Sequence, residues 1–221
     1  MFVGKKLRLG IVASGGGTNL QTIIDACQQG SIDAEVAVVV SNNPLAGALE
    51  RGRRAGIPVR CVNHREFKNR ASFDAALVES LREEQVELVC LAGFMRLLTS
   101  TMLEAFPERI MNIHPSLLPA FPGMNVQRQA IEYGARFSGC TVHFVDGGTD
   151  TGPIIIQAAV PILEHDDENS LSERILQQEH RIYPRAIQLF AEGRLRIEGR
   201  RVRIVPSPDG DEGAIVNPPL A

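Results

Sequence analysis

Short apolar runs alternate with longer amphipathic stretches along most of this chain, and that alternation restricts its fold more than any other feature. The runs are apolar on both faces, as in strands covered by helices on both sides, and the longer stretches have helical spacing. The expected strands are residues 7–13, 36–41, 59–62, 88–92, 110–113, 140–145 and 154–160. The expected helices are residues 19–29, 46–55, 71–84, 101–105, 126–133 and 171–192. The pattern predicts an α/β fold with a Rossmann-like, mainly parallel sheet and helices on both faces.

Several helix ends carry recognisable signals. Thr18, Thr101 and Ser170 each stand three residues before Gln or Glu, the spacing of a capping box, so helix starts are expected there. Gly30 and Gly56 follow the first two expected helices, where glycine often ends a helix.

The chain shows only one weak boundary, near its C-terminal end. With 221 residues, 44% of them hydrophobic, it is long enough to bury a core of its own. Residues 194–204 alternate basic and apolar side chains around Gly199, which predicts an exposed hairpin. Residues 206–221 are rich in Pro, Gly and Asp, which predicts a loosely held tail. We therefore expect one catalytic domain over residues 1–196, followed by a hairpin and tail over residues 197–221.

Composition argues against several classes of partner. The net charge is -3 and no Lys/Arg-rich block appears early in the chain, so a duplex-binding face is not expected. The cysteines are far apart and form no C-x-x-C pair, which favours buried thiols in a reducing compartment: Cys27, Cys61, Cys90 and Cys140. The first apolar run is too short for a signal sequence, and no run reaches membrane-spanning length. A cytoplasmic protein with no nucleic-acid and no membrane partner is expected.

A glycine-rich loop, "IVASGGGTNLQ", joins the first expected strand to the first helix. Unpaired N–H groups at a helix start, approached through glycines, form an anion site that most often takes phosphate. Thr18 and Asn19 would add side-chain donors. The spacing is neither G-x-G-x-x-G nor a P-loop, so the loop predicts a monophosphate without an adenine dinucleotide. The alternative is a tight turn with no ligand.

Two polar residues end the apolar run at 110–113. Asn112 and His114 are two apart and so lie on one face of a strand, at the carboxyl end where ligands of open α/β sheets bind. Asn112 would donate to a carbonyl oxygen, and His114 would move a proton or hold an oxyanion. The proline-rich exit "PSLLPAFPG" would help fix both groups. The alternative is a histidine that only serves the core or a loop.

A second stretch, "VHFVDGGTDTGPII", predicts a strand, a glycine-rich loop and another strand. The loop carries Asp146 and Asp150, and a carboxylate beside His114 would favour the imidazolium. An ordinary turn with two Asp residues is the alternative. His143, on the preceding strand, fits a supporting role in the site and a place in the core equally well.

Other chemistries find little support. The chain has no G-x-S-x-G motif, so no nucleophilic serine or cysteine is indicated. "EHDDEN" at residues 164–169 looks rich in metal ligands but directly precedes an expected helix start, where acidic side chains complement the helix dipole. No metal is expected.

Six segments together resemble the phosphoribosylglycinamide formyltransferase family, folate-dependent transformylases of the formyltransferase superfamily. They are "IVASGGGTNLQTIIDAC", "SNNPLAGALERGRRAGIP", "LAGFMRLL", "NIHPSLLPAFPG", "TVHFVDGGTDTGPIIIQA" and "QEHRIYPRAIQLFAEGRL", and the resemblance runs from about residue 7 to 196. It implies the formyltransferase fold and transfer of a formyl group from 10-formyltetrahydrofolate to the amine of 5-phosphoribosylglycinamide in de novo purine (IMP) biosynthesis. Asn112 and His114 would hold the oxyanion of a tetrahedral intermediate, and Asp150 would keep His114 charged and assist proton removal.

The resemblance also implies binding residues, with no metal. The substrate phosphate would rest on Gly17, Thr18, Asn19 and Leu20, and the glycinamide or ribose on Gln178 and Glu179. The folate would contact Arg70, Met95, Arg96, Leu97, Leu98, Asn112, Asp146, Gly147 and Asp150. Where the family commonly has Gly-x-Gly-Ser-Asn, this chain has Thr18 in place of Ser, which keeps the hydroxyl. The protein would be a monomer or a homodimer.

Three rival interpretations remain. A methionyl-tRNA formyltransferase would be expected to carry an additional basic C-terminal domain, and a formyltetrahydrofolate hydrolase an additional N-terminal regulatory domain. A non-catalytic nucleotide-sensing module would keep the glycine loop and tolerate loss of Asn112, His114 or Asp150, and all three are present.

Overall fold

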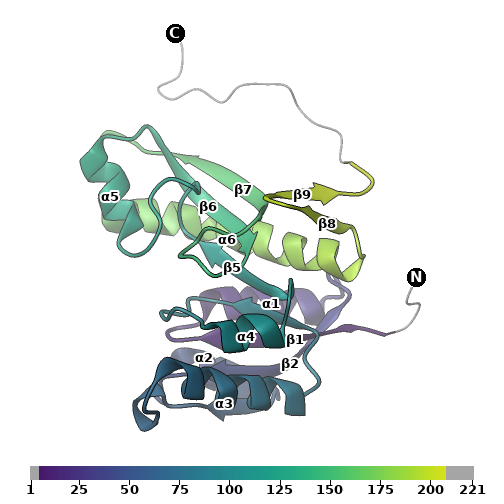
Figure 1. Ribbon diagram of the computed structural model, residues 1–221. Helices are drawn as coiled ribbons and strands as arrows, with labels where there is room; N and C mark the ends of the chain where they lie inside the picture. Colours follow the sequence, from purple (N-terminus) through teal and green to yellow (C-terminus); the bar gives the residue numbers. More distant parts are fainter. Residues whose placement is uncertain (1–4, 208–221) are drawn as a thin grey trace.

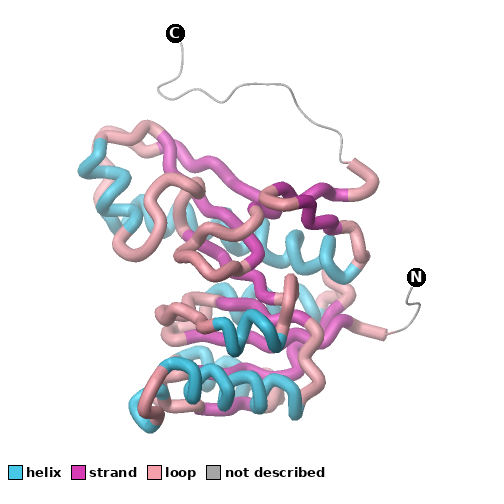
Figure 2. The backbone as a smooth tube through the Cα atoms, viewed as in Figure 1, coloured by secondary structure: helices cyan, strands magenta, loops and turns pink. Residues whose placement is uncertain are grey.

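The computed structural model describes residues 5–207, and across this range nine strands form a single sheet in the order β3-β2-β1-β4-β5-β6-β7-β9-β8. The strands are β1 (Leu7–Ala13), β2 (Ala34–Ser41), β3 (Val59–Cys61), β4 (Leu88–Leu91), β5 (Ile110–His114), β6 (Phe137–Phe144), β7 (Ile154–Pro161), β8 (Leu195–Glu198) and β9 (Arg201–Ile204). The helices are α1 (Thr18–Gln28), α2 (Gly47–Arg54), α3 (Arg70–Glu83), α4 (Ser100–Ala105), α5 (Val126–Tyr133) and α6 (Glu168–Ala191), with a 3-10 turn at His64–Glu66. Helices cover the sheet on both faces, so the predicted α/β class is confirmed (Figures 1 and 2).

The sheet has a parallel half and a mainly antiparallel half. Strands β3, β2, β1, β4 and β5 run parallel, whereas β6 pairs antiparallel with β5 and with β7. The chain moves outward from β1 to β3 and then crosses back to β4, so the strand order reverses beside β1. In open α/β sheets this reversal, at the carboxyl ends of the strands, is where ligands bind.

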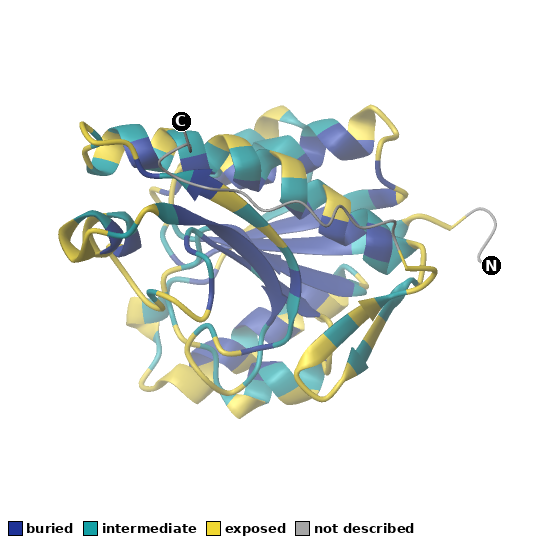
Figure 3. Cartoon of the chain, turned by 90° about the horizontal axis from the view of Figure 1, so that it is seen from above, coloured by how far each residue is buried: buried dark blue, intermediate teal, exposed yellow. Residues whose placement is uncertain are grey.

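Two apolar clusters hold the helices on the sheet. Successive residues of β1 alternate between them: Ile11 enters the cluster with α1 and α6, and Val12 enters the cluster with α3 and α4. The central strands are accordingly buried on both faces (Figure 3). This double burial explains why the strand runs lack the apolar–polar alternation of a half-exposed sheet.

Two of the predicted helix starts lie one or two residues from the true N-caps. Helix α1 begins at Thr18, but its N-cap is Gly17, in the left-handed region at φ 76°. Helix α4 is preceded by the N-cap Thr99 rather than Thr101. Neither N-cap makes a side-chain capping bond, so the capping boxes predicted there are wrong. The S/T-x-x-E/Q spacing also occurs inside helices, where it has no capping role.

The third predicted start, Ser170, lies inside helix α6. Asp167 is the N-cap and forms a capping box in which Ser170 returns the hydrogen bond. Asp166 pairs with the Arg174 guanidinium at 2.6 Å, and this contact holds the pKa of Asp166 well below its usual range. The acidic run before α6 therefore fixes a helix start, as its position in the sequence suggested.

The C-terminal basic segment forms the predicted hairpin. Strands β8 and β9 pair antiparallel across a turn in which Gly199 is left-handed. Strand β9 joins the sheet through one pairing, Ile154 with Arg201, and Arg200 donates to the Thr151 carbonyl at 3.0 Å. The loose tail predicted from residue 206 lies mostly outside the described residues, and the division of the chain after residue 196 stays a prediction.

Most other expectations for single residues hold. Gly30 and Gly56 are left-handed just beyond the ends of α1 and α2, as predicted. Cys61, however, is exposed at the end of β3, so the prediction of four buried thiols is wrong at this position. Burial raises the pKa of the Cys27 thiol to about 11 and that of Cys140 to about 12, which makes both unreactive at neutral pH. No helix between residues 5 and 207 combines the length and apolar character that a membrane crossing requires.

Candidate active site

Strand β5 delivers Asn112 and His114 to the carboxyl edge of the sheet, where the loop after β6 meets them. In the β5–β6 ladder Asn112 lies opposite His143. The loop between β6 and β7 then brings Asp150 back over the end of β5. The two stretches that the sequence singled out therefore meet in space.

His114 is buried and held at both ring nitrogens. Its Nε2 donates to the Phe121 carbonyl at 2.9 Å, and its Nδ1 lies 3.4 Å from Asp150 Oδ2. The same carboxylate oxygen accepts from the Gly123 amide at 2.9 Å. Phe121 and Gly123 belong to the proline-rich loop, so that loop supplies backbone groups that position both members of the pair. Because Nε2 is engaged by a carbonyl, Nδ1 is the nitrogen left for chemistry.

Asn112 is oriented by His143. The His143 Nδ1 lies 2.8 Å from the Phe144 carbonyl, which only accepts, so Nδ1 carries the proton and Nε2 accepts from Asn112 Nδ2 at 3.2 Å. Burial lowers the pKa of His143, which keeps the ring neutral and able to accept. The Asn112 amide also reaches Asp150 Oδ1 at 3.4 Å. This second bond is long, so a substrate oxygen would displace it with little loss.

The loop that carries Asp150 is braced by its own side chains. Asp146 Oδ1 accepts from the Gly148 amide at 3.0 Å and from the Thr151 hydroxyl at 2.6 Å. Asp150 itself is in the left-handed region, at φ 54°, a conformation that Asp tolerates better than most residues. The carboxylate is therefore held in place before any substrate arrives.

A cleft of about 770 Å³ opens beside these groups. Its volume suits an organic ligand of cofactor size. The residues expected to contact the folate line it together: Arg70, Met95, Arg96, Leu97, Leu98, Asn112, Asp146, Gly147 and Asp150. Met95 and Leu97 are 65% and 51% exposed and give the cleft an apolar wall that an organic ligand could contact.

The glycine loop and Glu179 form a second cluster of polar residues, outside the lining of this cleft. Asn19 Nδ2 donates to Glu179 Oε2 at 2.7 Å, and both side chains are buried. Burial raises the pKa of Glu179, while the bond from Asn19 works in the opposite direction. The Asn19 side chain uses one N–H in this bond, and its expected contact with phosphate stays a prediction. Leu20 is fully buried, so within this loop the backbone amides and the exposed Thr18 hydroxyl remain for an anion.

Besides Glu179, helix α6 carries Gln178, which was expected to contact the substrate, and Tyr183, to which the sequence assigned no role. Gln178 accepts from the exposed Arg181 side chain at 2.9 Å and takes no part in the Asn19–Glu179 pair. Tyr183, fully buried, places its hydroxyl 3.0 Å from the Leu91 carbonyl and 3.1 Å from the Met111 carbonyl, and so ties α6 to strands β4 and β5. Glu179 and Tyr183 share one signal in the sequence. They follow Ile175 at intervals of four residues, which places all three on the buried face of α6.

The chain matches the formyl transferase family over residues 7–187, which is most of its length. The chain belongs to the formyl transferase family. This membership confirms the resemblance seen in the sequence, and Asn112, His114 and Asp150 of this formyl transferase all lie inside the matched segment.

Two groups of relatives differ in length. The phosphoribosylglycinamide formyltransferase of Haemophilus influenzae is 44% identical over 191 residues, covering 86% of this chain and 90% of that protein. The trifunctional purine biosynthetic protein adenosine-3 of Drosophila melanogaster is 48% identical over 195 residues, covering 87% of this chain, but this formyl transferase spans only 14% of that protein.

A solved structure of similar size shares the fold. The glycinamide ribonucleotide transformylase 1 from Symbiobacterium toebii is 59% identical, with a TM-score of 0.90, and the match covers 91% of this formyl transferase and 95% of that chain. The mixed sheet and its surrounding helices are therefore those of a glycinamide ribonucleotide transformylase.

Proposed function

We propose that this formyl transferase carries the formyl group of 10-formyltetrahydrofolate to the amine of 5-phosphoribosylglycinamide, a step of de novo purine biosynthesis. The observation that carries the proposal is the pairing of His114 Nδ1 with Asp150, beside the oriented Asn112 amide, at the wall of the 770 Å³ cleft. The protein acts in the cytoplasm, as a monomer or a homodimer, and uses no metal.

The reaction needs an oxyanion site and a proton carrier. The substrate amine attacks the formyl carbon, a C–N bond forms, and the carbonyl oxygen becomes an oxyanion. Protonated His114 donates to that oxygen from Nδ1, and Asn112 Nδ2 donates in place of its long bond to Asp150. Collapse of the intermediate breaks the bond from the formyl carbon to the folate nitrogen. The proton lost by the amine ends on that nitrogen, so tetrahydrofolate and the formylated product leave.

Asp150 has two tasks in this scheme. Its Oδ2 faces His114 Nδ1 at 3.4 Å, so the carboxylate stabilises the imidazolium while the oxyanion exists. It also accepts the proton of the attacking amine, directly or through water. The Gly123 amide holds the carboxylate for both tasks.

The ribonucleotide occupies the side of the sheet edge nearer the glycine loop. Its phosphate accepts from the backbone amides at the start of α1, supported by the Thr18 hydroxyl. Glu179, buried on α6, accepts from the substrate's amine or ribose hydroxyls. Anchoring the phosphate and the ribose at a distance from the reacting centre orients the amine toward the formyl group.

The proposed activity is tested by mixing the protein with 10-formyltetrahydrofolate and following tetrahydrofolate release with and without 5-phosphoribosylglycinamide. Release that requires the ribonucleotide is the expected result. Release without it indicates a hydrolase, and absence of release from folded protein favours a nucleotide-sensing module.

Glu179→Gln is expected to separate activity from stability. Loss of a charged hydrogen-bond acceptor costs about 1.5–3 kcal/mol, so kcat/KM for the ribonucleotide should fall by roughly tenfold to a hundredfold. The folded protein should become more stable at pH 7–8, because burial raises the pKa of Glu179 and its ionised form is disfavoured there. The glutamine keeps an acceptor for Asn19 Nδ2 and offers a donor to Asn19 Oδ1, which has no partner among the described residues.

The pH dependence of that gain has a definite sign. Glu179 keeps its proton to higher pH in the folded protein than in the unfolded chain. The free energy of unfolding of wild type therefore falls as pH rises from the unfolded pKa of Glu179 through its folded pKa, and it stays lower above that range. The increase in Tm of Glu179→Gln over wild type should therefore shrink as pH falls toward about 4, near the pKa of an unfolded Glu. An unchanged Tm difference from pH 8 to pH 4 would contradict the explanation.

A further inference from the structure

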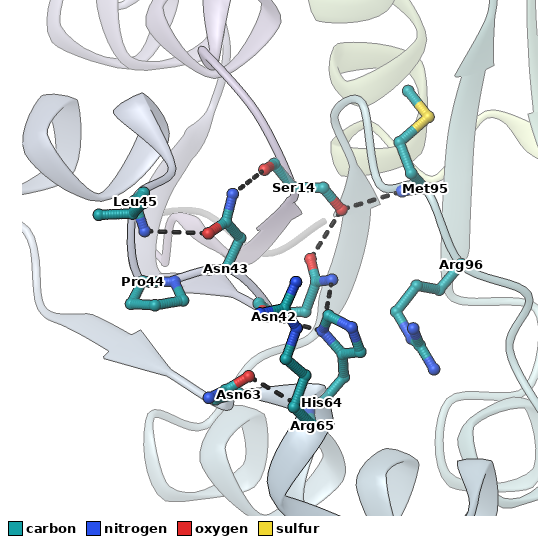
Figure 4. A pocket seen from close by; sticks show the side chains of 10 residues that line it. All are labelled: Ser14, Asn42, Asn43, Pro44, Leu45, Asn63, His64, Arg65, Met95 and Arg96. Atoms are coloured by element: carbon teal, nitrogen blue, oxygen red, sulfur yellow. Dashed lines mark hydrogen bonds between the residues drawn. The ribbon is translucent and has the colours of Figure 1, made fainter.

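The glycine loop is fastened to the segment that leads into and through α2. Three successive carbonyls of the loop accept hydrogen bonds from that segment: the Ser14 carbonyl from Asn43 Nδ2 at 3.4 Å, the Gly15 carbonyl from the Ala48 amide at 3.0 Å, and the Gly16 carbonyl from Arg51 Nε at 2.8 Å. The Asn43 side chain is itself held, because its Oδ1 accepts from the Leu45 amide at 3.0 Å (Figure 4). One neighbouring segment therefore fixes one face of the loop.

These contacts decide which way the N–H groups of the loop point. The C=O and N–H of a planar trans peptide unit point in opposite directions, so each carbonyl held toward α2 turns the following amide away from it. The amides of Gly15, Gly16 and Gly17 are turned in this way, and none of them donates to an acceptor in the part of the chain that the structure describes. Successive free amides that face one side form a nest for an anion.

Helix α2 lies directly against the loop, with Arg51 on the face that makes the contact. A Cβ on Gly47 would lie 3.2 Å from the Gly16 carbonyl oxygen, and a Cβ on Gly17 would lie 2.9 Å from Ala48. Arg51 follows Gly47 and Ala48 by four and three residues, so all three share one face of α2. The helix thus carries a guanidinium to the loop backbone at a point where glycine leaves no side chain in the way.

Arg51 brings positive charge to a loop that has none of its own. Neither the glycine loop nor helix α1 contains Arg or Lys. Among residues 5–207 Arg51 forms no ion pair. Its neighbours Arg53 and Arg54, by contrast, both pair with Glu50. The Arg51 guanidinium donates to the neutral Gln21 Oε1 at 3.2 Å as well as to the loop carbonyl, so no carboxylate offsets its charge.

We propose that Arg51 is a positioning residue for the substrate phosphate, an inference that rests on the proposed function. Arg51 holds the Gly16 carbonyl, which keeps the Gly17 amide turned toward the phosphate. Its positive charge lies behind the row of amides that the phosphate meets, and this charge favours a dianion over a neutral group. Arg51 therefore sets the affinity for the ribonucleotide and takes no part in formyl transfer at Asn112 and His114.

Arg51→Gln tests this role by separating KM from kcat. Loss of the charged donor should raise KM for 5-phosphoribosylglycinamide about tenfold, while kcat and KM for 10-formyltetrahydrofolate stay within about twofold of wild type. A side chain with a general structural role would change all three quantities. Arg51→Lys keeps the charge and one donor but loses the planar fork, so its KM for the ribonucleotide should lie between those of wild type and Arg51→Gln.

Arg54→Gln serves as the matched control. It removes the same charge from the same helix, but Arg54 is exposed and pairs with Glu50 at 2.9 Å instead of contacting the loop. KM for the ribonucleotide should therefore stay within about twofold of wild type. The role of Arg51 would be overturned by an unchanged KM in Arg51→Gln or by an equal rise in both Gln variants. An Arg51→Lys variant as weak as Arg51→Gln would overturn it as well.

A binding measurement separates failure of this role from failure of the proposed function. Calorimetric titration with ribose 5-phosphate should give a Kd about tenfold higher in Arg51→Gln than in wild type, and an unchanged Kd in Arg54→Gln. That result without formyl transfer would overturn the proposed function and support Arg51 as a phosphate residue. Normal formyl transfer with the same Kd in wild type and Arg51→Gln would overturn the role of Arg51 alone. Absence of both binding and formyl transfer in wild type would overturn the two together.

Discussion

Replacing His114 with alanine should lower kcat for formyl transfer by about 10²–10³-fold or more, with a much smaller change in KM for either substrate. Loss of a single oxyanion donor typically costs that much in rate. His114 donates at Nδ1 only while the oxyanion exists, so its removal raises the energy of the transition state more than that of the bound substrates. The remaining activity should reflect substrate positioning and the Asn112 amide.

Steady-state kinetics on Tm-matched protein would measure this effect. His165→Ala is a suitable control, because His165 is exposed before α6 and is remote in sequence from β5. His114→Ala also removes the partner of the Phe121 carbonyl, so circular dichroism should confirm that the variant is folded. Unchanged kcat in folded His114→Ala would remove the catalytic assignment and favour the nucleotide-sensing module.

Gly152→Ala should damage both stability and activity, although it adds a single methyl group. A Cβ at this position would overlap the Phe144 carbonyl oxygen and lie 2.8 Å from its carbonyl carbon. Both atoms belong to the backbone of β6 and cannot move aside as a side chain would. Strain of this kind costs about 3 kcal/mol, which corresponds to a Tm lowered by roughly 5–10 °C for a domain of this size.

Activity should fall further than stability alone explains, because Gly152 lies two residues from Asp150. A backbone shift there moves the carboxylate away from His114, so kcat should fall in the fraction that remains folded. Gly147→Ala is the matched stability control in the same loop, since a Cβ there meets no atom within 4 Å. Thermal melts that give both variants the same Tm would contradict the packing argument.

Local signals predicted most of the fold. Strand β1 and helix α5 have the predicted bounds, and the other elements of the core differ from prediction by a few residues at their ends. These elements were predictable because double burial of strands and amphipathic helices leave direct traces in the order of residues. The hairpin at β8 and β9 was equally visible from its alternation around Gly199.

Other features depend on contacts that a linear pattern does not contain. The helix caps were misplaced because Ser170 and Asp167 are both good capping residues, and backbone geometry decides between them. The four-residue spacing of α6 places Glu179 on the buried face, but its pairing with Asn19, 160 positions away, is a contact that no local rule anticipates. The meeting of Asp150 with Asn112 and His114 was expected from the family resemblance, because β6 runs antiparallel to β5 and its carboxyl end lies at the other edge of the sheet. The Phe121 carbonyl and the Gly123 amide that position His114 and Asp150 belong to a loop whose path the sequence does not specify.

The bond between Asn19 and Glu179 has a consequence for how this protein comes into being. The two residues are 160 positions apart, one at the first turn of α1 and the other near the middle of α6. A ribosome that adds about 5–20 residues per second needs roughly 8 to 30 seconds to make the second after the first. During that interval the glycine loop exists without its acidic partner. A nascent chain therefore lacks the Asn19–Glu179 pair until α6 has emerged and docked, so a ribonucleotide site that uses Glu179, as proposed, would form only at that point.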